Sequence, residues 1–209
     1  MSVDIAADIN LQDELILDEG ALTALFTEAR TANSFAPDEI SDETLQAVYA
    51  LTKMGPTAMN IQPLRITWVR SAEARERLVS HMADGNKAKT QAAPVVAILS
   101  YDTDWHELME TTAPHAAGMA PTFGGNEPLR TAMANNNSHL QAGFFIMAAR
   151  AAGLATGPMG GYDNAGLDAD FFAGTPQKSI MVVNLGKPNG IIDRPRLERL
   201  DYDVATATV

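Results

Sequence analysis

Hydrophobic residues recur at helical spacing in several segments, and each segment predicts an amphipathic helix. Apolar residues at positions i, i+3, i+4 and i+7 predict a first helix over 19–31. Ser41 is expected to be the N-cap of the next helix, which Gly55-Pro56 ends because proline cannot continue a helix. Further helices are expected over residues 71–83, 102–112, 136–152 and 163–172. Residues 1–18 precede the first helix and are interpreted as an N-terminal arm.

Three segments have the pattern of β-strands. Apolar and polar residues alternate over 65–69, which predicts a half-buried strand. Residues 94–100 and 179–185 are short apolar runs, which are typical of strands buried in the centre of a sheet. Because strands and helices are mixed along the chain, the sequence predicts one domain of the α+β or α/β class over residues 19–209.

Residues 136–152 form the most apolar of the expected helices. Its apolar residues are Leu140, Phe144, Phe145, Met147, Ala148 and Ala151. A helix that is apolar nearly all round is buried in a core or in a subunit interface, and both positions stay open. Gly153 suits the position just after its end. The preceding segment 113–130 is rich in proline and glycine, and is expected to be an irregular loop that acts as a lid.

The composition argues against several classes of partner. The formal net charge is −11, and an acidic surface repels nucleic acids and anionic membranes. The absence of cysteine excludes disulfides, thiolate nucleophiles and Cys-ligated metal centres. The acidic N-terminus lacks the basic region of a secretory signal, and no window approaches 18 apolar residues. We therefore expect a cytoplasmic protein with neither nucleic acid nor membrane as a partner.

Common catalytic signatures are missing from the sequence. It contains none of the G-x-G-x-x-G, G-x-x-x-x-G-K-[ST], G-x-S-x-G and H-E-x-x-H patterns. Its 4 histidines lie far apart, and no two of them have the i, i+4 spacing of a helical metal site. The sequence therefore predicts no metal centre and does not favour a hydrolase.

Two arginine-containing segments are candidates for binding a phosphate. Arg30, Thr31 and Asn33 combine a guanidinium, a hydroxyl and an amide, all of which can donate hydrogen bonds. Arg194 and Arg196 fall near the C-terminus, and the arginine fork matches phosphate oxygens. The alternative interpretations are a polar helix terminus for the first segment and a solvated charge cluster for the second.

Two further segments suit a flat heteroaromatic ligand. Asn60 and Gln62 lie in the loop 55–64, and their amides offer the donors and acceptors that a ring edge with C=O and N–H groups needs. Glycines in the segment 156–161 allow a backbone to approach a flat ligand closely. The alternatives are an Asn-stabilised turn for the first segment and a flexible surface loop for the second.

Taken in order, these segments resemble the motifs of the nitroreductase family, between residues 20 and 200. The matching residues are Arg30-Thr31-x-Asn33, Pro56-Thr57-x-x-Asn60-x-Gln62-Pro63, Gly157-Pro158-Met159-x-Gly161 and Arg194-x-Arg196. Within the family, three short stretches resemble the malonic semialdehyde reductase branch, also described as 3-hydroxypropionic acid dehydrogenases. These stretches are Ala29–Asn33, Pro114-His115 and Gly157–Met159.

The resemblance implies a nitroreductase-like, three-layer α/β/α fold, with a mixed central sheet flanked by helices, in an interwoven homodimer. FMN would bind between the two subunits. Arg30, Thr31 and Asn33 would meet its phosphate and ribityl chain, and Arg194 and Arg196 would complete the phosphate clamp. The flavin ring would be lined by Pro56, Thr57, Asn60 and Gln62 of the partner chain, and by Pro158, Met159 and Gly160, whose backbone would face N5.

The resemblance also implies an FMN-dependent oxidoreductase that takes hydride from NADH or NADPH and passes it to a small acceptor. Malonic semialdehyde, reduced to 3-hydroxypropionate, is the acceptor that the branch suggests. The flavin carries the chemistry, so no protein acid or base is required. His115 is a candidate proton donor and otherwise a lid-packing residue. Three alternatives stay open: a broad nitro- or quinone-reductase, a non-catalytic flavin-binding protein, and an interaction protein that dimerises through residues 136–152.

Overall fold

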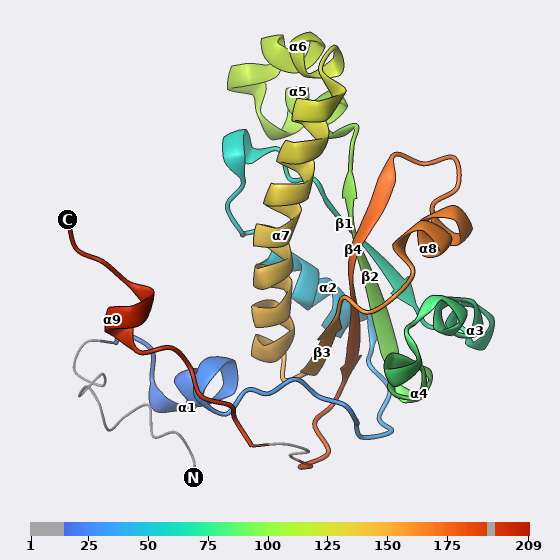
Figure 1. The fold of residues 1–209 in the computed structure, drawn as a ribbon, viewed down its shortest axis with the longest axis vertical. Coiled ribbons are helices and arrows are strands. Elements are labelled where there is room, and N and C mark those ends of the chain that lie inside the picture. Colours follow the sequence, from blue (N-terminus) through green and yellow to red (C-terminus); the bar gives the residue numbers. More distant parts are fainter. Residues whose placement is uncertain (1–14, 192–194) are drawn as a thin grey trace.

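A four-stranded sheet is the centre of the computed structural model, which describes residues 15–191 and 195–209 (Figure 1). In spatial order the strands are β1 (Leu64–Val69), β2 (Val95–Asp102), β4 (Gln177–Gly186) and β3 (Ala155–Met159). All pairings between these strands are antiparallel, so the sheet is not the expected mixed one. Parallel pairing among the described residues is confined to the isolated bridge between Thr31 and Thr156. A mixed sheet needs a parallel pair of strands, which this part of the chain does not supply.

Helices cover both faces of the sheet, which confirms the three-layer α/β/α arrangement (Figure 1). One face carries α2 (Asp42–Thr52) and α7 (Glu127–Ala151), and the other carries α3 (Ala72–His81), α4 (Asp84–Ala92) and α8 (Asn164–Phe171). Side chains of β2 alternate between two cores: Ala97 and Leu99 pack on the α2 and α7 side, and Val96 and Ile98 on the opposite side. All four are fully buried, as the apolar run predicts for a central strand.

The first helix is shorter than the sequence predicts. α1 (Glu19–Leu22) passes into a wider π-helical turn, η2 (Thr23–Thr27), so the helix ends before residue 31. The guanidinium groups of Arg30 and Arg196 bind carbonyl oxygens at this end. These carbonyl oxygens accept hydrogen bonds from arginine side chains in place of the backbone N–H groups of a further helical turn. The helix can therefore end here, and Arg30 lies outside it.

The predicted start and end of α2 are confirmed. The Ser41 hydroxyl accepts a hydrogen bond from the Thr44 backbone N–H at 3.2 Å, as an N-cap does, and the helix ends before Gly55-Pro56. α3 covers most of the expected helix 71–83, but α4 is not predicted by the pattern. The reason is that α4 is almost entirely polar and buries a single residue, Thr90, so it has no apolar stripe to detect.

Residues 105–124 form short helices, so the expectation of an irregular loop over 113–130 is wrong, whereas a lid role for this segment stays a prediction. The elements are η4 (Trp105–Leu108), α5 (Met109–Thr112), η5 (Pro114–Met119) and α6 (Ala120–Gly124). α7 follows and begins at Glu127, earlier than the expected residue 136. Prolines occupy the first turns of η5, α6 and α7, where the missing N–H would have no helical partner anyway. They start helices here, although their density in the sequence indicates a loop.

A third core anchors these short helices. Trp105 is fully buried, and its ring centroid lies 4.9 Å from that of Phe123. Ile61 and Ala134 belong to the same cluster. The short helices are therefore packed against the first half of α7 and against the loop 56–63 that precedes β1.

α7 divides its apolar residues between the core and the surface. Phe145 is fully buried, but Leu140 is 56% exposed and Phe144 is 43% exposed. The buried face includes three polar residues, Asn137, Ser138 and Gln141. The sequence left a core and a subunit interface open for this helix. The core contains one side of the helix, with Phe145. A subunit interface stays the prediction for the exposed Leu140 and Phe144.

The remaining segments bear on single predictions. Gly153 follows α7 with φ 76°, the left-handed conformation expected there. The segment 156–161 is not simply a loop, because it includes most of β3. Most of the predicted arm lies outside the described residues, and so does Arg194. Near the C-terminus α9 (Tyr202–Ala205) is a single turn. In the described ranges, no helix combines the length and apolar character needed to cross a membrane.

Candidate functional site

The predicted segment 30–33 lies beside β3, which contains most of the predicted segment 156–161. The backbone N–H of Ala32 donates to the Thr156 carbonyl oxygen at 2.9 Å, and Thr31 forms the parallel bridge with Thr156. A Cβ added to Gly157 would lie 2.6 Å from the Ala32 carbonyl oxygen, which is closer than any side chain tolerates. Glycine at this position therefore allows the segment containing Arg30 to approach β3.

Arg30 and Arg196 converge on the same helix end, although they are far apart in sequence. Arg196 donates to the carbonyl oxygens of Phe26, Thr27 and Ala29 at 2.7–2.9 Å, and Arg30 donates to two of these. Burial, and then the charge of Arg30, lowers the pKa of Arg196. The charge of Arg30 is unfavourable for the neighbouring Arg196 guanidinium, so a bound anion would stabilise this arrangement.

The loop 56–63 has an unusual backbone. Met59, Asn60 and Gln62 have φ values of 53°, 59° and 43°, a left-handed region that non-glycine residues seldom adopt. The Asn60 amide donates to the Thr112 carbonyl oxygen at 2.6 Å, and the Gln62 amide donates to Asn60 Oδ1 at 3.0 Å. Each amide keeps a second N–H, and the Gln62 oxygen accepts no hydrogen bond from the described residues, so both donors and an acceptor remain for a ligand.

The other predicted residues have plain surroundings. Thr57 Oγ1 accepts a hydrogen bond from the Gln62 backbone N–H at 3.2 Å, while Pro56 is exposed. The Met159 side chain is buried in the core, which leaves only its backbone for a ligand. Its neighbour Gly160 is exposed, as is His115 on η5. The described residues contain no cluster of metal-ligating side chains.

The predicted residues fall at opposite edges of the sheet. The loop 56–63 leads into β1, whereas residues 30–33 and 156–160 lie along β3. β2 and β4 separate these edges (Figure 1). One chain therefore brings together residues 30–33, residues 156–160 and Arg196, and places the loop 56–63 at the opposite edge of the sheet.

Residues 27–187 match the Nitroreductase family. The chain belongs to the nitroreductase family. A Leptothrix cholodnii relative, by name an NADH dehydrogenase/NAD(P)H nitroreductase, is 50% identical over 193 residues, covering 92% of this chain and 98% of that protein. A Bacillus subtilis nitroreductase structure has a TM-score of 0.80 at 20% identity, covering 92% of this chain and 100% of that one. A nitroreductase of Exiguobacterium sibiricum in complex with FMN has a TM-score of 0.77 at 18% identity, covering 90% and 97%.

These comparisons confirm the predicted family and the nitroreductase fold. They make the chain an oxidoreductase of that family. They do not show that the chain belongs to the malonic semialdehyde reductase branch.

The structure adds two cations to the candidate site that sequence reasoning missed. Arg150, in the last turn of α7, donates to the Leu25 carbonyl oxygen at 3.0 Å. Burial and the nearby charge of Arg196 lower its pKa. Lys89 of α4 donates to Asn33 Oδ1 at 3.3 Å. Arg150 could have been found as the lone arginine of the predicted apolar helix 136–152, but Lys89 lies on the helix that the pattern does not predict.

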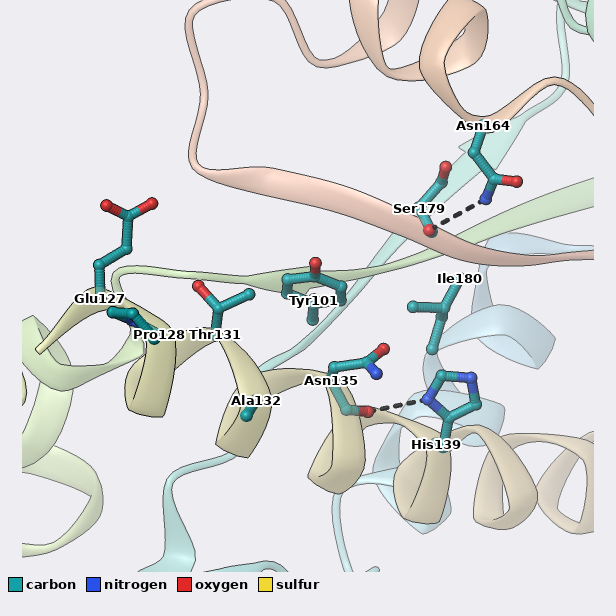
Figure 2. Close-up of a pocket in the computed structure, with 10 residues that line it drawn as sticks. All are labelled: Tyr101, Glu127, Pro128, Thr131, Ala132, Asn135, His139, Asn164, Ser179 and Ile180. Atoms are coloured by element: carbon teal, nitrogen blue, oxygen red, sulfur yellow. Dashed lines mark hydrogen bonds between the residues drawn. The ribbon is translucent and has the colours of Figure 1, made fainter.

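Two cavities open among the described residues, and a predicted site residue borders the smaller one. One, of about 800 Å³, lies between α7 and the ends of β2 and β4; Figure 2 shows Asn135 and His139 of α7 below Ile180 of β4. None of the predicted site residues lines it. Burial and then the charge of Asp168 raise the pKa of Tyr101 in its wall. The second cavity, of about 390 Å³, is bordered by Gln62, so it adjoins the loop 56–63.

Proposed function

We propose that this chain binds FMN and passes hydride from NADH or NADPH to a small acceptor. The observation that carries the proposal is the convergence of Arg30 and Arg196 beside β3, whose backbone is open at Gly160. The family and the FMN complex of the Exiguobacterium protein support the cofactor.

The chain's own residues suit a phosphate-bearing flavin. Arg30 and Arg196 would hold the phosphate together with Arg194, which lies outside the described residues. Thr31 and Asn33 would contact the ribityl chain, with Lys89 beside Asn33. The flavin ring would lie against the backbone of the segment Pro158, Met159 and Gly160. FMN, when bound, supplies the hydride carrier between the two substrates.

We also propose that a homodimer completes the site, with Pro56, Thr57, Asn60 and Gln62 supplied by the partner. These residues lie at the opposite sheet edge from β3, so a single chain does not bring them to its own phosphate site. Large apolar side chains on α2, in the turn just after it and on α7 are exposed, as a subunit interface requires: Tyr49, Leu51, Met54, Leu140 and Phe144. The C-terminal segment exposes others, and it extends away from the sheet (Figure 1): Leu197, Leu200, Tyr202 and Val204.

The acceptor is the finer part of the proposal. The branch resemblance suggests malonic semialdehyde, and the name of the 50% identical relative suggests nitro compounds. A carbonyl acceptor needs a proton as well as hydride, and water or the exposed His115 could supply it. A flavin-storage protein is the non-catalytic alternative, but exposed residues such as Gly160 suit substrate access better than storage.

A visible absorption spectrum, recorded before and after anaerobic addition of NADH, tests the function. Flavin bands that bleach with NADH are expected. Protein that stays colourless after FMN is added would refute FMN binding, and flavin that stays oxidised with NADH and with NADPH would favour storage. Steady-state assays on malonic semialdehyde, nitrofurazone and menadione then identify the acceptor, and ping-pong kinetics are expected because two substrates share one site in turn.

A further inference from the structure

Two amide side chains of α7 hold the two ends of the loop 56–63. Asn137 Oδ1 accepts a hydrogen bond from the Ala58 backbone N–H at 2.7 Å. Gln141 Oε1 accepts one from the Leu64 backbone N–H at 3.1 Å. Residues four apart lie on one face of a helix, so both amides project from the same stripe of α7. Both side chains are largely buried, at 7% and 3% exposure, although polar residues usually avoid such positions.

The backbone between these anchors holds the positive-φ non-glycine residues found in the described part of the chain. Three of its residues, Met59, Asn60 and Gln62, have positive φ, and such conformations persist only where surrounding contacts impose them. Local bonds within the loop do not replace the anchors, because they join the loop only to itself, as from Gln62 N–H to Thr57 Oγ1. The contacts with α7 and with the Thr112 carbonyl oxygen fix the loop to the rest of the domain.

We infer that Asn137 and Gln141 are positioning residues, which hold Asn60 and Gln62 in the conformation that receives the flavin. The inference rests on the proposed function. Neither residue needs to touch the cofactor. Asn137 is itself oriented, because its amide N–H donates to the Met133 carbonyl oxygen at 2.8 Å and so turns its oxygen towards Ala58.

The same helix couples the loop to the exposed apolar surface. A Cβ on Gly55, at the start of the loop, would lie 2.8 Å from the Phe144 ring. Phe144 and Leu140 point away from the core, one turn along from the two amides. One side of α7 therefore holds the loop 56–63, and another side carries the proposed dimer surface. The position of the loop relative to that surface is set by a single helix.

The test compares variants that remove an acceptor with variants that keep it. Asn137→Leu and Gln141→Leu remove the hydrogen bond to the loop, whereas Asn137→Asp and Gln141→Glu retain an acceptor oxygen. Ser138→Ala is the matched control, because Ser138 is also buried on α7 but its hydroxyl has no hydrogen-bond partner in the described part of the chain. FMN Kd, the visible circular dichroism of the bound flavin at saturation, and the melting temperature of the FMN-free protein are measured for each full-length variant.

We expect the leucine variants to raise the FMN Kd about tenfold and to change the flavin dichroism, since one loop anchor is lost. Gln141→Glu should recover most of the affinity, whereas Asn137→Asp should recover only part of it, because aspartate lacks the N–H that donates to the Met133 carbonyl oxygen. Ser138→Ala should match the wild type. A merely structural role would lower the melting temperature and leave Kd and dichroism unchanged, which would overturn the inference. If one leucine variant does not fold, the comparison of the other leucine variant with its own acid counterpart decides the question. Wild-type protein that binds no FMN would instead remove the proposed function, and the inference with it.

Discussion

Replacing Arg75 with methionine measures how far the fold depends on one buried guanidinium. Arg75 lies on α3, is 5% exposed, and forms no ion pair among the described residues. It donates to the carbonyl oxygens of Thr90 at 3.0 Å, Val69 at 3.1 Å and Pro94 at 3.3 Å, and also to that of Ala93. One side chain thereby ties the ends of α4 and β1 to the start of β2.

The expected cost follows from two opposing contributions. Hydrogen bonds to a charged group contribute about 1.5–3 kcal/mol each, and methionine leaves three buried carbonyls and one half-buried carbonyl without this donor. Methionine also removes the desolvation cost of a buried charge, which is several kcal/mol. The carbonyls left without a donor outweigh this relief, so we expect a net loss of about 3–5 kcal/mol in the free energy of unfolding. For a domain of this size, the melting temperature should fall by about 6–20 °C.

Urea unfolding followed by tryptophan fluorescence measures this loss, because Trp105 is fully buried and reports on the core. Arg75→Lys should be intermediate, since a single ammonium replaces the two guanidinium nitrogens that donate. Arg199→Met is the matched control. Arg199 is exposed, and its hydrogen bonds within the described ranges are to the neighbouring carbonyl oxygens of Leu197 and Glu198, so its loss should stay within about 0.5 kcal/mol. A loss below about 1 kcal/mol for Arg75→Met would refute the reasoning.

Three further predictions concern the site and its support. Gly157→Ala places a methyl group against a backbone carbonyl and should destabilise the protein by about 1–3 kcal/mol in urea unfolding; unchanged stability would contradict the close approach. Arg196→Ala should weaken FMN binding by about 1.5–3 kcal/mol in fluorescence titration, and unchanged affinity would remove Arg196 from the phosphate site. Hydrogen bonds from Arg77 and His81 lower the pKa of Asp170. The resulting stability is therefore present above the unfolded pKa of about 3.9 and is lost as pH falls through the lower folded value. Asp170→Asn should flatten the stability profile in that acid range, and an unchanged profile would exclude the contribution.

The sequence predicts those parts of the fold that depend on burial pattern. β2 is buried on both sides, and its apolar run is visible in the sequence. α2 has both an N-cap serine and a Gly-Pro end, so its boundaries could be predicted. α4 could not, because it contributes one buried residue and is held by Arg75 through its carbonyl groups, an interaction that leaves no periodic signal.

The parts of the site were predicted more readily than their arrangement. Residue types alone indicate that Arg30 and Arg196 suit a phosphate, but their meeting on the carbonyls of η2 depends on the whole fold. The left-handed backbone at Met59 and Gln62 is likewise imposed by contacts from α7, since these residue types do not favour it. Proline-rich sequence between residues 113 and 130 was misleading, because a proline in the first turn of a helix and a proline in a loop look the same in sequence.

The placement of the candidate residues at opposite sheet edges has a consequence for mixed assemblies. In the proposed dimer each chain contributes a phosphate half to one cofactor and a loop half to the other. A dimer of one Arg196→Ala chain and one Gln62→Ala chain would combine both lesions in one pocket and leave the second pocket entirely wild type. Such heterodimers should therefore regain half of the native FMN capacity, although neither parent homodimer contains an intact pocket. Interallelic complementation of this kind follows from the antiparallel order β1-β2-β4-β3, which keeps the two halves apart within a chain.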